Sequence, residues 1–226
     1  MIYFNKVSKI YPDQSVALDD VSFTIEPGQF TSVVGHSGAG KSTLLKMIIA
    51  EEYPSAGNIF FNSSDIHKLP RRHIAKLRRR IGTVFQDFRL LPAKTVFENV
   101  AFVMETAGRT EEEIASDVPY ILDLVGLSPK LRSFPGQLSS GERQRVAIAR
   151  AIVNQPDLLL ADEPSANLDP INTLEIIEIL CKINETGTTV LMTTHNKGVI
   201  DNLGKRVITL ENGKVTRDDK TGKYVL

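Results

Sequence analysis

The sequence predicts an α/β fold with a partly parallel core, an antiparallel β portion at the N-terminus and a helical subdomain in the middle. Apolar, β-branched runs alternate with amphipathic segments in the last third of the 226 residues, an order typical of parallel strands covered by helices. Strand-like runs fill most of the first 61 residues, separated by Pro and Gly. Three S/T-x-x-E patterns between residues 95 and 142 mark expected helix starts.

The first 95 residues are expected to be mainly strands with two helices. Strands are predicted at Ile2–Tyr11, Val16–Ile25, Phe30–Val34, Asn58–Phe61 and Ile81–Phe85, and helices at Lys41–Ala50 and from Pro70 to Ile81. The second helix carries many basic residues. We interpret them as a solvated face, because no aromatic side chains interleave them as a nucleic-acid site would require.

The rest of the chain is expected to alternate helices and strands. Helices are expected to begin at Thr95, Thr110 and Ser139. Later strands are expected at Leu158–Ala161, Thr188–Thr194 and Arg206–Leu210. The helices between them are expected at Pro170–Thr186 and Lys197–Leu203. We therefore expect one domain over 1–226, with its core at 1–95 and 155–226 and a helical subdomain at about 96–154.

Composition excludes several classes of protein. Lys plus Arg and Asp plus Glu each number 27, so the net charge is zero and we expect no nucleic-acid partner. The longest apolar run, Val100–Met104, is far shorter than the roughly 20 residues that cross a bilayer. No secretory signal is visible, and the single cysteine, Cys181, fits a reducing cytoplasm. We expect Cys181 to lie in the core.

The strongest chemical signal is a phosphate-binding loop. The segment Gly35-His-Ser-Gly-Ala-Gly-Lys41-Ser42 fits G-x-x-x-x-G-K-[ST] between a predicted strand and a predicted helix. Backbone N–H groups and the helix start would hold phosphates, Lys41 would reach the β- and γ-phosphates, and Ser42 would bind Mg²⁺. The expected cofactors are ATP and Mg²⁺, held by Gly35, His36, Ser37, Gly38, Ala39, Gly40, Lys41, Ser42 and Thr43.

A second signal is the apolar strand that ends in Asp162-Glu163. Ligands of open α/β sheets bind at the carboxyl ends of the strands, where these two side chains are expected. Asp162 is placed to hold Mg²⁺ through water, and Glu163 to polarise the water that attacks the γ-phosphate. An acidic turn with no catalytic role is the alternative.

With these motifs the chain resembles the ATP-binding-cassette (ABC) ATPases over nearly its whole length. Leu138-Ser-Ser-Gly-Glu142 is similar to that family's signature, usually L-S-G-G-Q, and departs from it at Ser140 and Glu142. The resemblance implies a P-loop NTPase of ABC type with a RecA-like core. It also implies that two copies close around ATP, so that Ser139, Gly141 and Glu142 of one copy complete the site of the other.

Further residues match the family in its usual order. The resemblance implies that Gln86 touches Mg²⁺ and the attacking water, and that His195 contacts the γ-phosphate. It also implies that Tyr11 stacks on adenine, and that Asp169 belongs to a loop at the dimer interface, with an ordinary helix cap as its alternative reading. The implied catalytic residues are Glu163, His195 and Gln86, and the implied metal-binding residues are Ser42, Gln86 and Asp162.

Two segments, Val84–Pro92 and Thr95–Phe102, look most like the cell-division branch of the family. That resemblance implies a homodimer in the ATP-bound state that drives an integral membrane partner from the cytoplasmic side of the cell membrane. We expect Phe88, Leu90 and Leu91 to receive the partner, with Arg89 at the rim; packing onto the helical subdomain is the alternative.

Other classes of protein share some of these features. Lipoprotein-release and macrolide-export ATPases share many of the motifs. A nucleotide-gated scaffold with little turnover is compatible with the altered signature. DNA-repair and translation ATPases of the superfamily carry a coiled-coil insertion or two cassettes, and neither is present in this sequence. A small-molecule P-loop kinase would have no use for Leu138–Glu142.

Overall fold

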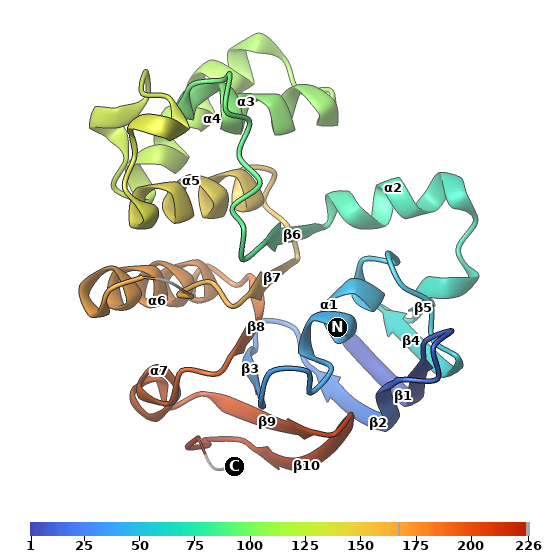
Figure 1. Cartoon of the computed structure of the whole chain (residues 1–226). Helices are drawn as coiled ribbons and strands as arrows, with labels where there is room; N and C mark the ends of the chain where they lie inside the picture. Colours follow the sequence, from blue (N-terminus) through green and yellow to red (C-terminus); the bar gives the residue numbers. More distant parts are fainter. Residues whose placement is uncertain (167, 225–226) are drawn as a thin grey trace. The chain divides into compact units, whose positions relative to one another are not determined.

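A computed structural model describes residues 1–166 and 168–224 of the chain (Figure 1). The chain divides into two compact units, one made of Met1–Arg78 with Thr189–Leu226 and the other of Arg79–Thr188. The predicted division into a core at 1–95 and 155–226 and a helical subdomain at about 96–154 stays a prediction.

The first unit begins with a four-stranded sheet in the order β2-β1-β4-β5. Its strands are β1 (Ile2–Ile10), β2 (Val16–Ile25), β4 (Ala56–Phe61) and β5 (Ser64–Asp65). All pairs in it are antiparallel, which confirms the predicted N-terminal β portion. On β1, Ile2, Phe4 and Val7 are fully buried, and their side chains fasten this sheet to the core of the unit.

Parallel strands carry the second sheet of this unit. Strand β3 (Phe30–Val34) pairs in parallel with β8 (Thr189–Thr194) and β9 (Arg206–Glu211), while β10 (Lys214–Asp219) pairs antiparallel with β9. Every residue of β3 and β8 is buried, as a parallel strand covered on both faces requires. The helices of the unit are α1 (Lys41–Ile48), α2 (Arg71–Arg79), which ends at the boundary, α7 (Lys197–Leu203) and the 3₁₀ turn Ile66–Lys68.

Two strands, β5 and β10, were not predicted. Most side chains of β10 are exposed and polar, so it carries no apolar alternation. The signal that was present is Asn212-Gly213, whose φ angles of 48° and 78° form a tight hairpin turn between β9 and β10.

The described residues of the second unit, 79–166 and 168–188, form two parallel strands and four helices. Its strands are β6 (Ile81–Val84) and β7 (Leu158–Asp162), and its helices are α3 (Val96–Ala107), α4 (Glu111–Leu124), α5 (Ser140–Ile152) and α6 (Pro170–Glu185), with 3₁₀ turns at Ser128–Lys130 and Pro135–Gln137. Capping boxes at Thr95, Thr110 and Ser139 start α3, α4 and α5 as predicted. Within the described residues, no helix is long and apolar enough to cross a membrane.

One prediction about this unit is wrong. Cys181 is half-buried and does not lie in the core. The buried stripe of α6 runs through Ile176, Leu180 and Ile183. Cys181 follows Leu180 by one residue, about 100° around the helix, and so lies at the flank of that stripe.

Candidate nucleotide-binding site

The loop Gly35–Gly40 joins the carboxyl end of β3 to the start of α1, the connection that a phosphate-binding loop requires. Gly40 has a φ of 103°, and a Cβ there would lie 2.3 Å from the backbone oxygen of Ala17. Only glycine therefore fits immediately before the helix. The N-terminal end of α1 follows directly, and its dipole favours an anion at the loop.

Lys41 turns back into this loop and is buried. Its Nζ donates hydrogen bonds to the backbone oxygens of Gly35 at 2.8 Å and His36 at 3.1 Å. A buried ammonium needs such acceptors, and phosphate oxygens would add stronger, charged ones. The side chain therefore lies where a phosphate held by the loop would meet it.

A hollow of about 270 Å³ opens beside the loop. It is lined by His36, Ser37, Gly38, Ala39, Glu211 and Asn212. Sequence reasoning did not single out Glu211, the last residue of β9, or Asn212 in the turn that follows it. They reach the loop because Val34 at the end of β3 is in register with Thr209 of β9.

Two further predicted residues lie in the same unit as the loop. Val34 is in register with Thr194 at the end of β8, so His195 follows at the sheet edge from which the loop departs. Tyr11 lies beside the first turn of α1, where its hydroxyl is 3.3 Å from Thr43 Oγ1. The Nζ of Lys9 is 4.9 Å from the centre of the Tyr11 ring. The expected contacts of both residues with γ-phosphate and adenine stay predictions.

In the second unit, the other predicted catalytic residues follow the carboxyl ends of two neighbouring parallel strands. Val84 of β6 is in register with Ala161 of β7, so Gln86 and the pair Asp162-Glu163 follow the same edge. Glu163 has a φ of 47°, a left-handed conformation that is costly for a residue other than glycine. Strain of this kind is concentrated at functional sites, which supports a catalytic hypothesis for Glu163.

The predicted metal ligands are oxygen donors only. Ser42 supplies a hydroxyl, Gln86 an amide oxygen and Asp162 a carboxylate. Mg²⁺ prefers such ligands, and it commonly takes one or two carboxylates plus waters and substrate phosphates. The described part of the chain contains no group of three His, Cys, Asp or Glu residues that could hold a metal. The donor set therefore fits Mg²⁺ bound together with a nucleotide.

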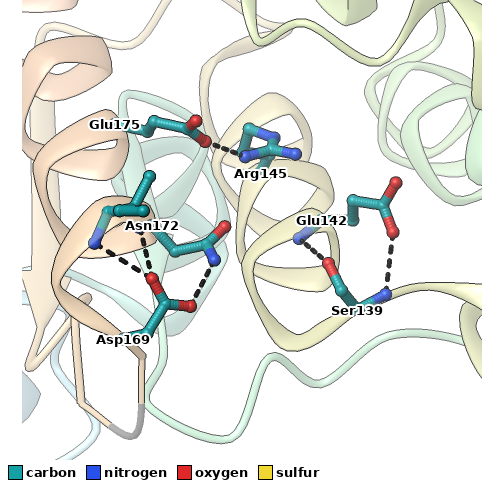
Figure 2. Close-up of polar contacts among 7 residues, drawn as sticks. Ser139, Glu142, Arg145, Asp169, Asn172 and Glu175 are labelled. Carbon is teal, nitrogen blue, oxygen red and sulfur yellow. Dashed lines mark hydrogen bonds and ion pairs between the residues drawn. The ribbon is translucent and has the colours of Figure 1, made fainter.

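The start of α5 carries the signature segment, which is the name used here for Leu138–Glu142. Ser139 Oγ accepts from the Glu142 backbone N–H at 3.2 Å, and Glu142 Oε2 accepts from the Ser139 backbone N–H at 2.8 Å (Figure 2). The hydrogen bond from the Ser139 backbone N–H, together with the nearby Lys130, holds the pKa of the Glu142 carboxyl below its ordinary value. Glu142 therefore turns back onto its own helix in the charged form.

The start of α6 lies beside the start of α5 (Figure 2). Asp169 caps α6 by accepting from the backbone N–H groups of Ile171 and Asn172, both at 3.0 Å. The Asn172 amide in turn donates to Asp169. The ordinary cap reading of Asp169 is thus confirmed, and its interface role stays a prediction. Asn167, in the same loop, lies outside the described residues.

The segment after Gln86 has two residues in the left-handed backbone conformation, and an arginine distant in the sequence donates hydrogen bonds to their backbone oxygens. Phe88 and Arg89 have φ angles of 58° and 48°, and the guanidinium of Arg150 donates to their backbone oxygens at 2.9 and 2.6 Å. The Arg89 side chain pairs with Asp87 at 3.1 Å and lies 3.8 Å from the centre of the Phe85 ring. The backbone is therefore tied to α5, while about half of the Arg89 side chain stays exposed.

Comparisons with known proteins agree with this geometry. Residues 18–166 match the family model described as ABC transporter. The chain is 51% identical over 224 residues to the "Cell division ATP-binding protein FtsE" of Bacillus subtilis, covering 99% of this chain and 98% of the relative. The protein of the same name from Escherichia coli is 48% identical over 213 residues, which cover 94% of this chain and 96% of that relative.

Solved structures of ATP-binding cassettes are similar to this chain in fold and sequence. A dimeric structure of the ATP-binding cassette MJ0796 in a post-hydrolysis state, bound to ADP and Pi, has a TM-score of 0.89 and 36% identity, covering 99% of this chain and 100% of that one. The structure of cbiO1 from Clostridium perfringens, part of an ABC transporter complex, has a TM-score of 0.90 and 31% identity, covering 97% and 88%.

Proposed function

Because the chain belongs to the ABC transporter family and is an ATPase, we propose that it is the ATP-hydrolysing subunit of a membrane complex that acts in cell division. The observation that carries this proposal is 47–51% identity, over 99% of the chain, to cell-division ATP-binding proteins of three genera. The proposed partner is an integral membrane protein resembling FtsX, the partner of FtsE. The chain would then lie in the cytoplasm, peripherally on the inner face of the cell membrane.

The proposed mechanism divides the work among residues of two copies. Gly35–Thr43 bind the phosphates of ATP and Tyr11 stacks on its adenine. Ser42, Gln86 and Asp162 hold Mg²⁺, which when bound neutralises phosphate charge. Glu163 takes the proton of the attacking water, with His195 at the γ-phosphate. The residues expected from the second copy are Ser139, Gly141, Glu142 and Asp169.

In support of this division, the charged Glu142 is folded back onto its own helix start, where its Oε2 accepts from the Ser139 backbone N–H. ATP held between two copies stabilises a two-fold homodimer by mass action, and hydrolysis releases it. Opening and closing of the dimer would move the membrane partner.

Depletion of the chain in its own cells tests the cellular role. Loss of the chain is expected to block septation, and the parent but not Lys41→Ala is expected to restore it. Lys46→Ala changes an exposed lysine on the same helix and should restore division fully. If depleted cells divide normally but retain a lipoprotein or fail to export a macrolide, the export alternative replaces the proposal.

A further inference from the structure

The two oxygens of the Glu142 carboxylate have different partners. Oε2 accepts from the backbone N–H of Ser139 at 2.8 Å, and Oε1 lies 3.3 Å from the Nζ of Lys130. Lys130 comes from the short 3₁₀ turn Ser128–Lys130, twelve residues before Glu142 in the sequence. The Glu142 side chain is 19% exposed and that of Lys130 is 41% exposed, so solvent screens this ion pair only in part.

We propose that Lys130 is a positioning residue for ATP, because it neutralises and holds back the carboxylate at the start of the signature helix α5. The inference rests on the proposed function, in which this helix start meets the ATP bound by a second copy. An exposed carboxylate in the first turn would repel the triphosphate that the helix dipole attracts. The glutamine usual at this position in ABC ATPases is neutral and needs no such lysine.

The chain contains a matched pair of charges at the start of α4. Glu113 Oε2 accepts from the Thr110 backbone N–H at 2.8 Å, and Glu113 Oε1 pairs with Arg109 at 2.8 Å. This is the same arrangement of capping carboxylate and cation, at a helix to which no role in ATP binding is assigned. Arg109→Ala therefore controls for the general cost of removing a cation from a capping box.

The test measures ATP-induced dimerisation by sedimentation in the Glu163→Gln background, in which ATP hydrolysis is expected to be about 10²-fold slower. Lys130→Ala should raise the dimer dissociation constant by about two- to fivefold, the scale of a partly exposed ion pair. Lys130→Arg should restore the parental value. When Glu142→Gln is also present, Lys130→Ala should leave the dimer dissociation constant unchanged. Arg109→Ala should leave it unchanged in every background.

The possible failures are distinct. If Glu163→Gln does not dimerise with MgATP, the proposed function fails and the inference falls with it. If it dimerises and Lys130→Ala equals the parent, the inference alone is overturned. A loss that persists in the Glu142→Gln background would show that Lys130 acts through packing and would also overturn it.

Discussion

The side-chain oxygen of Asn172 occupies the space that any residue larger than glycine would need at position 141. A Cβ built on Gly141 would lie 2.0 Å from Asn172 Oδ1. Asn172 can turn away only by giving up the hydrogen bond from its amide Nδ2 to the Asp169 carboxylate. The close approach of α5 and α6 therefore depends on the glycine of the signature segment.

Replacing that glycine should disturb the signature segment. Gly141→Ala forces Asn172 to move and is expected to lower the free energy of unfolding by about 1–3 kcal/mol, the usual cost of overpacking. It should also weaken ATP-induced dimerisation. Thermal melting and sedimentation measure the two effects, and Gly141→Ala/Asn172→Ala should recover both. Gly136→Ala, with nothing within 4 Å of its added Cβ, serves as the control. Equal melting of all variants would contradict this contact.

Removing the lysine of the phosphate loop should abolish nucleotide binding without unfolding the protein. The Nζ of Lys41 donates to the backbone oxygens of Gly35 and His36 in the loop, and Lys41→Ala removes a point charge from the phosphate site. Calorimetry with ATP should show a severe loss of affinity. Lys46→Ala should bind as the parent does, and ATP affinity unchanged in Lys41→Ala would refute the assigned role.

Most of the fold was predictable because its signals are local. The capping boxes at Thr95, Thr110 and Ser139 lie within four residues each, and the phosphate loop lies within eight. Strand β10 was missed because its exposed side chains carry no periodicity.

Parts of the candidate site depend on contacts between residues that are distant in the sequence. Arg150 reaches Phe88 and Arg89 across about 60 residues, and Asn172 meets Gly141 across 31. Lys130 and Glu142 belong to different elements. No local pattern encodes these pairs, so only the three-dimensional structure identifies them.

The exposed side chain of Arg89 should contribute to docking of the membrane partner. Arg89→Glu reverses the charge beside Asp87 but leaves the Arg150 bonds, which involve only backbone oxygens at 88 and 89. Co-purification with the membrane partner should be lost while ATP binding and melting are retained. Arg217→Glu is a matched control, because Arg217 also pairs with an aspartate two residues away at 3.1 Å. Parental recovery of the partner with Arg89→Glu would show that docking lies elsewhere.

Acidification should destabilise the first unit through His67. Burial is the main cause that lowers the pKa of His67 below 6.5, with Lys9 adding to the effect and Asp65 opposing it. Because the unfolded state takes up the proton first, stability is full above the unfolded pKa and declines as the pH falls below about 6.5. His67→Gln should weaken the dependence of the melting temperature on pH over this range. His73→Gln, which changes an exposed histidine, should keep the parental dependence. An unchanged slope in His67→Gln would exclude His67 as the cause.

Glu163 should act in hydrolysis and not in binding. Glu163→Gln keeps the shape of the side chain but cannot accept a proton, so we expect parental ATP affinity and turnover reduced about 10²-fold or more. Phosphate release and calorimetry measure the two quantities. Turnover equal to the parent would show that another group takes the proton.

Light scattering on Glu163→Gln tests the central claim, that two copies close around ATP, most directly. With ATP and Mg²⁺ the variant should double its mass, and with ADP, or with ATP when Mg²⁺ is chelated, it should stay a monomer. Adding Lys41→Ala to the variant should abolish the dimer. A strict monomer at high protein concentration with saturating ATP and Mg²⁺ would contradict the account.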